Sequence, residues 1–501
     1  MTRQYKKITS CNVAIKTALV AALAISAAIA QAKQFTVSAW RGETVAELVE
    51  DFAISSMDLS LLPEGVTGRM GTLCEVRYMT MPKSLQYLSS ADRVEWDSDE
   101  MGPKVVELTV SPDAKAGEYD VGPMKLKIVD RVLPAPKDWK YYLDLWQHPW
   151  AVSRTADVRP FSWRHYRAMR PIWELLATAG QKSLTVSILD EPWDHQCFDA
   201  YHSMIKRTLG KDGSWTYDYS LFDEYVEFGR SCGIGPDISC YTMCPWGYIV
   251  RYTGPDGKTV AVEAKPGTKV FDDFWAPFLV DFAAHLKAKG WFKDTYIAMD
   301  ERSPEDVLYI ANFVQKYAPG MRIAMAGNRK PSDFKGITID SYSQVLSHVT
   351  DDFLAECESR RAKGFVTTHY VCCAPVYPNT FMSSAAGEAF WNGVFPGFVG
   401  LDGFLRWAWN SWGEDAMKDA SYWVWRAGDT FLVYPDGSPS WRFLDLRNGI
   451  VAAEKLRILK EQGLYAEEIA KLAKNFKAKE AVANKSNFKA LRILTLNLVN
   501  K

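Results

Sequence analysis

Adjacent acidic side chains are the clearest candidates for chemistry in this chain of 501 residues. Asp-Glu pairs stand at positions 99–100, 190–191, 223–224 and 300–301. Two carboxyl groups that reach one ligand can divide proton transfer and charge stabilisation between them. Neighbouring side chains of a regular strand point to opposite faces, so both acids of a pair reach one ligand only where a strand has ended and the backbone turns. The elements around each pair therefore decide which of the four is a candidate.

Short apolar segments alternate with helix-like segments through residues 134–460. The candidate strands are residues 141–146, 183–189, 236–243, 295–300, 321–327, 336–340, 364–371 and 403–410. Eight strand–helix units on a chain of this length predict a (β/α)8 TIM barrel over residues 134–460. A doubly wound open sheet is the alternative fold, but the Gly-x-Gly-x-x-Gly motif typical of it does not follow the first candidate strand.

The segments on either side of the barrel have different patterns. Residues 1–32 combine basic residues, an apolar run at 17–30 and an Ala-Gln-Ala motif, which predicts a signal peptide and export to the periplasm or the exterior of a bacterial cell. Residues 33–133 contain short β-branched segments between Gly, Pro and Asp turns, which predicts an N-terminal β-sandwich. Residues 461–501 are expected to form an extension with a lysine-rich helix at 464–483 and a closing strand at 488–499.

The composition excludes some classes of partner. The chain has 59 basic and 60 acidic residues, so charge gives no reason to expect nucleic acid or an anionic membrane as a partner. Cys-x-x-Cys and His-x-x-x-His patterns are missing, and neither a metal nor a cofactor is expected. After the predicted signal peptide no apolar run is long enough for a transmembrane anchor. Cys372 and Cys373 are interpreted as two buried free thiols, with a vicinal disulfide as the alternative.

Two of the four acid pairs fall where a barrel would place its active site, at the carboxyl ends of strands. Residues 300–301 end the fourth candidate strand and residues 190–191 end the second, whereas 223–224 lie within a helix-like segment and 99–100 in the β domain. Residues 300–301 have a competing structural role in capping the next helix. That role requires neither acid, because Ser303 can provide the cap.

Several segments, taken in this order, resemble glycoside hydrolase family 123. They are YYLDLWQHPWAVSR (141–154), GSWTYDYSLFDEYVE (213–227), YIAMDER (296–302), HYVCCAPVYPNTF (369–381), GFLRWAWNSW (403–412) and AGDTFLVYPDGSPSWRFLDLRNGI (427–450). The resemblance extends from about Phe35 to Lys460. It implies an N-terminal β-sandwich, a catalytic barrel and an exo-acting β-N-acetylgalactosaminidase that retains anomeric configuration. The family's catalytic motif is an adjacent Asp-Glu pair, which matches Asp300 and Glu301.

The mechanism that the resemblance implies uses a nucleophile from the substrate. The oxygen of the sugar's 2-acetamido group attacks the anomeric carbon and forms an oxazolinium intermediate, an exception to the usual two-carboxylate scheme. Glu301 would be the general acid, and Asp300 would hold the acetamido N–H and offset the developing positive charge. The implied partner is a glycan or glycoconjugate with a terminal β-linked amino sugar.

Further residues near the strand ends are candidates for substrate binding. The chain has 19 tryptophans, and flat aromatic faces suit sugar rings, although a large core uses them equally well. Trp407, Trp409 and Trp412 are predicted to form an aromatic floor under the sugar. Tyr342 and Tyr370 are expected to hydrogen-bond the acetamido oxygen. The candidates for binding sugar hydroxyls or other polar groups are Trp146, Gln147, His148, Asn379 and Arg406.

Two other functions remain open from the sequence. Glu191 and Glu301 could act as the acid and nucleophile of a conventional retaining glycosidase, which would not need an acetamido group on its substrate. A carbohydrate-binding protein on a barrel without activity is the third hypothesis, although the intact pair Asp300 and Glu301 argues against it.

Overall fold

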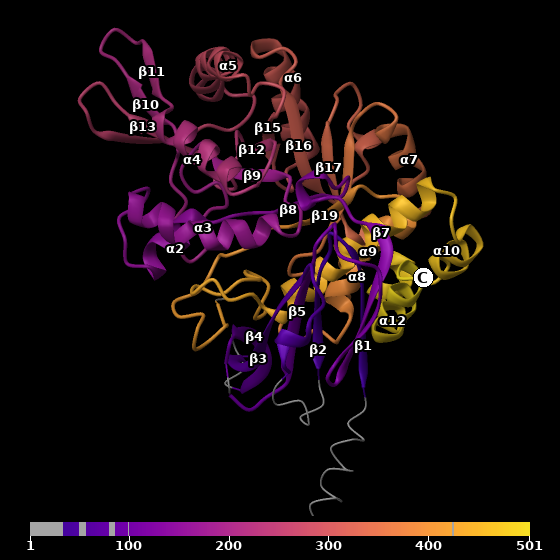
Figure 1. Ribbon diagram of the computed structural model, residues 1–501. Coiled ribbons are helices and arrows are strands. Elements are labelled where there is room, and N and C mark those ends of the chain that lie inside the picture. Colours follow the sequence, from indigo (N-terminus) through magenta and orange to yellow (C-terminus); the bar gives the residue numbers. More distant parts are fainter. Residues whose placement is uncertain (1–33, 50–56, 80–85, 99, 423–424) are drawn as a thin grey trace, which may run out of the picture. The chain divides into compact units, whose positions relative to one another are not determined.

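The computed structural model describes residues 34–49, 57–79, 86–98, 100–422 and 425–501 (Figure 1). The predicted signal peptide at 1–32 lies outside the described residues. The chain divides into two compact units. Of the described residues, the first unit comprises those in 34–73 and 95–133 with Asn500, and the second comprises those in 74–94 and 134–499 with Lys501.

The predicted β-sandwich lies mainly in the first unit, while residues 74–79 of β3 and 87–94 of β4 are assigned to the second. One sheet has the order β1-β7-β6 and the other has the order β2-β5-β3-β4. Alternate residues of β7 and of β5 point into one core shared by both sheets, which explains the period-two pattern of these segments. The strands are β1 (Phe35–Arg41), β2 (Thr44–Val49), β3 (Val66–Met79), β4 (Tyr87–Trp96), β5 (Lys104–Val110), β6 (Gly117–Val121) and β7 (Met124–Val132), with a short 3-10 turn η1 (Leu59–Leu61).

The second unit contains the predicted TIM barrel. Eight parallel strands follow one another in the order β8-β19-β18-β17-β16-β15-β12-β9. Most of their residues are buried, as expected for parallel strands covered on both faces. The strands are β8 (Tyr142–Leu145), β9 (Ser183–Ser187), β12 (Asp237–Tyr241), β15 (Thr295–Met299), β16 (Arg322–Gly327), β17 (Ser341–Val345), β18 (Val366–Tyr370) and β19 (Gly403–Arg406).

Helices and short turns connect the barrel strands. None of the described helices combines the length and apolar character that crossing a bilayer requires. The connecting elements are η2 (Pro136–Asp138), α2 (Pro149–Thr155), α3 (Trp163–Ala177), α4 (Ser220–Ser231), α5 (Lys269–Lys289), α6 (Pro304–Tyr317), η3 (Pro331–Asp333), η4 (Leu346–His348), α7 (Asp351–Arg361), α8 (Glu388–Val399) and α9 (Trp441–Glu461).

Two hairpins inserted after β9 and β12 form an additional sheet that the sequence did not predict. Its order is β11-β10-β13-β14, and Figure 1 shows it at the edge of the barrel unit beyond α4. Its strands are β10 (Lys206–Leu209), β11 (Trp215–Asp218), β13 (Ile249–Thr253) and β14 (Thr259–Glu263). The insertions lengthen the loops at the carboxyl ends of two strands, where a barrel places its active site.

Two glutamine side chains contribute to the junction between β8 and β9, the first two barrel strands along the chain. The Gln181 side chain accepts the Leu145 N–H at 3.0 Å and donates to Ser183 O at 2.7 Å. The Gln147 side chain accepts the Thr185 N–H at 2.8 Å and also donates to Leu145 O. Side-chain amides thus add to the backbone hydrogen bond at this junction, from Lys182 N–H to Leu143 O at 2.9 Å. Gln147 is buried and engaged there, which favours a structural role over the predicted contact with sugar.

The predicted sixth barrel strand is displaced in the structure. Residues 336–340 form a loop, and β17 begins only at Ser341. Asp340 closes that loop on β16, because its carboxylate accepts the Ile323 N–H at 2.8 Å and its own N–H donates to Ile323 O at 2.9 Å. The true strand, SYSQV, is polar but almost wholly buried, so its composition concealed it.

The predicted closing strand at 488–499 is wrong, because these residues form helix α12 (Phe488–Val499). Its buried residues include Phe488, Leu491, Thr495 and Leu498, which recur every three or four positions as on one face of a helix. The predicted lysine-rich helix is present as two shorter helices, α10 (Ala466–Ala473) and α11 (Ala478–Val482).

Candidate active site

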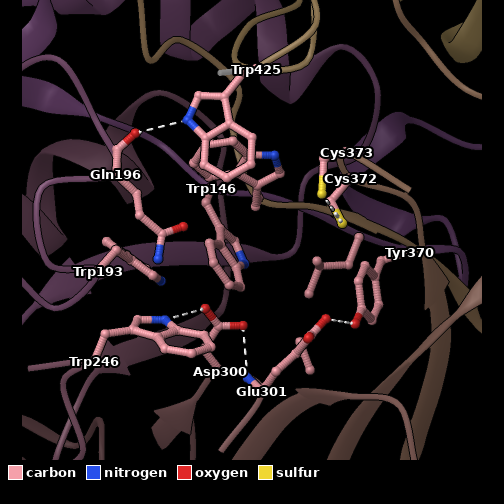
Figure 2. Close-up of a pocket in the computed structure, with 13 residues that line it drawn as sticks. Trp146, Trp193, Gln196, Trp246, Asp300, Glu301, Tyr370, Cys372, Cys373 and Trp425 are labelled. Atoms are coloured by element: carbon pink, nitrogen blue, oxygen red, sulfur yellow. Dashed lines mark hydrogen bonds between the residues drawn. The ribbon is translucent and has the colours of Figure 1, made fainter. Parts of the chain in front are cut away.

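A cavity of about 210 Å³ lies at the carboxyl ends of the barrel strands (Figure 2). Its lining comes from seven of the eight strands or the loops that follow them, so residues far apart in the sequence share one site. The lining residues are Trp146, Trp193, Gln196, Trp246, Asp300, Glu301, Ala326, Tyr370, Cys372, Cys373, Leu405, Trp407 and Trp425.

Asp300 follows the last residue of β15, and two N–H groups fix its carboxylate. The Glu301 backbone N–H donates to Oδ1 at 2.8 Å, and Trp246 Nε1–H donates to Oδ2 at 3.1 Å (Figure 2). Burial raises the pKa of Asp300 to about 6, against the opposing effect of these two donors. The group is therefore an oriented carboxylate that titrates close to neutral pH.

Glu301 is the second acid of the cavity, and it accepts a hydrogen bond from the Tyr370 hydroxyl through Oε1. Burial, together with the negative charge of Glu301, raises the pKa of Tyr370 well above its ordinary value. The phenol thus stays protonated and remains a donor to Glu301. Tyr370 was expected to bind the acetamido oxygen, and in the structure its hydroxyl is directed at the second acid instead (Figure 2).

Neither acid is needed to cap the helix that follows. The Ser303 side chain accepts the Asp306 N–H at 3.2 Å and caps α6. Residues 300–302 form only a short connection between β15 and this cap. Asp300 and Glu301 are therefore free to face the cavity.

Arg302 holds the indole that binds Asp300. Its guanidinium lies 4.9 Å from the Trp246 ring and 4.7 Å from the Tyr248 ring, and its Nε–H donates to Cys244 Sγ at 3.3 Å. Such cation–π contacts stabilise a ring in a set orientation. The loop after β12 thus supplies the donor that orients the first acid.

The family description "Glycoside hydrolase 123, catalytic domain" matches residues 146–459, which include both acids and all the residues that line the cavity. The chain belongs to glycoside hydrolase family 123. The match covers the barrel from the end of β8 almost to the end of α9. No protein among the curated sequences matches the chain.

A solved structure of a family 123 enzyme resembles the fold, whereas the likeness to a xylanase is weak. A family 123 glycoside hydrolase from Clostridium perfringens, studied for glycolipid glycan hydrolysis, has a TM-score of 0.78 at 22% identity, covering 93% of each chain. The endo-1,4-beta-D-xylanase 10B of Clostridium thermocellum has a TM-score of 0.35 at 10% identity, covering 83% of this chain and 86% of its own. The first likeness extends over both units of the family 123 fold.

Three of the predicted substrate-binding residues line the cavity with the two acids: Trp146, Tyr370 and Trp407. Trp146 is almost fully buried and stacks on Trp193 at 5.3 Å between ring centroids. Trp407 packs against Trp425 at 5.2 Å. The cavity therefore has an aromatic surface on more than one side of the acid pair.

His148 and Tyr342 were predicted to contact substrate, but neither lines the cavity. His148 stacks on Tyr201 at 3.7 Å, its Nε2 lies 3.0 Å from Asp199 O, and burial lowers its pKa to about 3. The Tyr342 hydroxyl donates to Arg329 O, and the residue lies within β17 rather than at its end. Both positions favour roles in packing.

Trp409 and Trp412 also lie outside the cavity lining and are fully buried. Trp409 packs on Phe443 at 4.7 Å, and Trp412 donates from Nε1 to Val433 O at 2.6 Å. The prediction placed Trp409 within the eighth strand, which was expected to extend to residue 410, and Trp412 just beyond it. Because β19 ends at Arg406, the alternation of faces does not extend to them.

Asn379 and Arg406 are buried behind the cavity wall rather than within it. Arg406 pairs with the buried carboxylate of Asp429 at 2.8 Å and donates to Asn379 Oδ1 at 3.0 Å. Asp429 also accepts Trp407 Nε1–H at 3.0 Å. These two predicted site residues therefore hold residues of the cavity wall in place.

Several lining residues were not predicted from the sequence to belong to the site: Trp193, Gln196, Trp246, Ala326, Cys372, Cys373, Leu405 and Trp425. Trp193, Gln196, Trp246 and Trp425 lie in long loops without hydrophobic periodicity, so no local pattern indicated their direction. The one signal for the three tryptophans was the high tryptophan content of the chain. Among the described residues, no group of three or more His, Cys, Asp or Glu side chains is placed to hold a metal ion.

Proposed function

We propose that this family 123 glycoside hydrolase removes terminal β-linked N-acetylgalactosamine by substrate-assisted hydrolysis with retention of configuration. One observation carries the proposal: Asp300 and Glu301 are the only carboxylates among the described residues that line the cavity. A conventional retaining glycosidase needs two carboxyl groups on either side of the scissile bond. Two consecutive acids on one side suit a substrate that provides its own nucleophile.

The two acids are suited to different roles. Asp300 is held as an oriented acceptor by Trp246 and by the Glu301 backbone, so it can receive the acetamido N–H and direct the acetamido oxygen at the anomeric carbon. Its negative charge offsets the positive charge that develops on the oxazolinium ring.

Glu301 then acts as the general acid. It gives its proton to the leaving glycosidic oxygen and recovers it from the water that opens the oxazolinium ring. The Tyr370 hydroxyl supports this exchange by stabilising the carboxylate that forms after the first proton transfer. The Trp146 and Trp407 rings are in position to pack against the sugar and its acetamido methyl group.

The position of Glu191 argues against the conventional mechanism in which it would be the nucleophile. Glu191 does not line the cavity, and its carboxylate accepts the His195 N–H at 3.3 Å within its own loop. The intact acid pair in the cavity likewise argues against a protein that binds carbohydrate without hydrolysing it. The similar enzyme from Clostridium perfringens was described in glycolipid glycan hydrolysis, which supports a glycan as the substrate class.

The decisive experiment compares aryl β-glycosides that differ only at the 2-position. We expect hydrolysis of the 2-acetamido galactoside and no measurable hydrolysis of the 2-hydroxy galactoside. Successive fluorination of the acetamido methyl group should lower kcat steeply, because fluorine makes the attacking oxygen less nucleophilic. Equal rates on the 2-acetamido and 2-hydroxy substrates would contradict the proposal, and a faster 2-acetamido glucoside would change the preferred sugar without changing the mechanism.

Export of the protein is a second part of the proposal, and it rests on the pattern of residues 1–32. Expression of the full gene in a Gram-negative host should yield a mature protein that begins near Lys33 in the periplasmic or extracellular fraction. N-terminal sequencing of each fraction tests this expectation, and an intact N-terminus in the cytoplasm would contradict it.

A further inference from the structure

Two adjacent thiols form part of the cavity wall. Cys372 and Cys373 lie two and three residues after Tyr370, both line the cavity, and their Sγ atoms are 3.8 Å apart (Figure 2). Cys373 is exposed and Cys372 is partly exposed, so the expectation that both are buried is wrong. Cys232, Cys240, Cys244 and Cys357, in contrast, are buried.

Buried polar groups fix the backbone that carries these thiols. Asn379 Nδ2 donates to Cys372 O at 2.9 Å and to Pro375 O at 2.7 Å. Arg406, which is fully buried, donates to Val371 O at 3.3 Å and orients Asn379 through its Oδ1. The loop is therefore held at both sides of the cysteine pair, while the two sulfur atoms remain at the cavity.

We propose that Cys372 and Cys373 are a site of reversible vicinal disulfide formation, and that the resulting disulfide is part of the surface that contacts the sugar substrate. The oxidant is a low-molecular-weight disulfide. The first part depends only on the two thiols, and the second part rests on the proposed function of the cavity.

The reaction is an ordinary thiol–disulfide exchange in two steps. The Cys373 thiolate attacks one sulfur of the oxidant, which forms a mixed disulfide and releases one thiolate. The Cys372 thiolate then attacks Cys373 Sγ, which forms the Cys372–Cys373 bond and releases the second thiolate. The two protons lost by the cysteines go to the two leaving thiolates, so one disulfide is reduced for each one formed.

The structure favours Cys373 as the first nucleophile. Its side chain is the more exposed of the two, and the hydrogen bond from Cys372 lowers the pKa of its thiol. Cys372 is then in contact with the mixed disulfide, because its sulfur is already 3.8 Å from that of Cys373.

Such a disulfide is expected to be easily reduced. Consecutive Cα atoms are about 3.8 Å apart across a trans peptide, which is below the usual disulfide separation of roughly 4.4–6.8 Å. The bond therefore forms under strain, and strained, exposed disulfides have the more oxidising potentials of labile bonds. Formation of the disulfide at this site should therefore be reversible.

Oxidation also changes the cavity wall. The two sulfur atoms move from 3.8 Å to about 2.05 Å apart, and two separate side chains become part of one rigid ring. A rigid surface loses less conformational entropy when substrate binds, so the oxidised protein should have the lower KM. Neither sulfur takes part in proton transfer, and kcat should change little.

The first test measures mass and needs no turnover. The full-length protein is reduced, treated with oxidised glutathione, and alkylated with iodoacetamide before intact-mass and peptide analysis. We expect a loss of about 2 Da in the peptide that contains both cysteines, reversed by dithiothreitol. The variant Cys372→Ser should stop at the glutathione adduct of Cys373, whereas Cys74→Ser, which removes a partly exposed thiol outside the cavity lining, should behave like wild type.

The second test measures KM for the aryl 2-acetamido galactoside in both redox states. Wild type should have a KM about threefold lower when oxidised. The double variant Cys372→Ser/Cys373→Ser should not respond to oxidation. A stable glutathione adduct on wild-type Cys373 without loss of mass would overturn disulfide formation, and equal KM values for the two redox states would overturn the contact with substrate. If the galactoside is not hydrolysed at all, the proposed function fails, while the mass experiment still decides whether the disulfide forms.

Discussion

Two acid pairs follow strands of the same barrel, yet their surroundings differ. Asp300 and Glu301 are part of a connection of a few residues between β15 and α6, and both line the cavity. Asp190 and Glu191 begin a much longer connection between β9 and α4 that contains the hairpin β10–β11. Neither of them lines the cavity.

The second pair is used to organise its own loop. Asp190 Oδ1 accepts the Ser203 N–H at 3.0 Å and lies 3.5 Å from His202 Nδ1. Glu191 has a positive φ of 51° and donates its backbone N–H to Tyr201 O at 2.9 Å. A position at a strand end is therefore not sufficient for a catalytic role. The loop that follows decides whether the carboxylates face the cavity or stabilise the backbone.

The largest expected difference between the pairs comes from their glutamates. Glu301→Gln should lower kcat/KM by about 10³-fold on substrates with poor leaving groups, because the amide cannot donate the required proton. Glu191→Gln should stay within about twofold of wild type, since an amide can still accept the His195 N–H. Steady-state kinetics of both variants tests the comparison, and similar losses in the two variants would remove the distinction between the pairs.

The two aspartates should differ in both activity and stability. Asp300→Asn should lower kcat by about 10²-fold to 10³-fold, because the charge proposed to offset the oxazolinium ring is lost. Asp190→Asn should leave kcat unchanged and reduce the free energy of unfolding by about 1 kcal/mol through its contacts with Ser203 and His202.

At high pH the Asp300→Asn substitution should raise the free energy of unfolding, whereas Asp190→Asn should lower it. The pKa of Asp300 in the folded protein is raised to about 6, so the folded state binds more protons than the unfolded state and loses stability as the pH rises from about 4 through 6. Asp300→Asn removes this penalty and should be more stable than wild type at pH 8, by about 1 kcal/mol because the group is partly exposed. Denaturant unfolding at pH 5 and 8 measures the difference; a variant less stable than wild type at pH 8 would contradict the assignment.

A smaller fall in kcat is expected when the hydroxyl that donates to Glu301 is removed. Tyr370→Phe removes one hydrogen bond to Glu301, the proposed general acid, and should lower kcat about tenfold. Tyr342→Phe is the matched control, because its hydroxyl donates to a backbone carbonyl outside the cavity lining. The control should lose stability without losing kcat, and an equal fall in kcat for both variants would show that the Tyr370 effect is structural.

The smallest expected effect is a shift in the pH dependence of kcat/KM when the indole N–H that donates to Asp300 is removed. If Asp300 acts as a carboxylate, kcat/KM should rise with pH through about 6. Trp246→Phe removes a hydrogen bond that lowers the pKa of Asp300, so this rise should move upward by about half a pH unit. Trp425→Phe is the control, since its Nε1–H donates to Gln196 O, and its profile should keep the wild-type midpoint.

The sequence predicted the barrel and the position of one acid pair because strong local patterns encode both. Seven of the eight barrel strands were placed within a few residues by apolar runs that end at turns, and the pair at 300–301 directly follows one of them. The strand at Ser341–Val345 was displaced because its buried residues are polar. The helix at Phe488–Val499 was mistaken for a strand because its β-branched and leucine residues obscured their helical spacing.

The rest of the site depends on contacts between loops that no local pattern describes. Trp246 reaches Asp300 across a separation of 54 residues, and Tyr370 reaches Glu301 across 69. Arg406 and Asn379 were assigned to the substrate because polar residues near a strand end suggest binding. Their buried contacts with Asp429 and with backbone carbonyls become visible only in three dimensions.

The junction between β8 and β9 gives the barrel an unusual dependence on two residues. A complete cylinder of strands has no free edge. Here the amides of Gln147 and Gln181 add to the backbone hydrogen bond from Lys182 N–H to Leu143 O, and each amide donates to two carbonyl oxygens and accepts one backbone N–H. Glutamate has almost the same shape, but its ionised form has no N–H to donate. Replacing either glutamine with glutamate should thus weaken the junction between β8 and β9 and expose more of the sheet edge from which aggregation can begin.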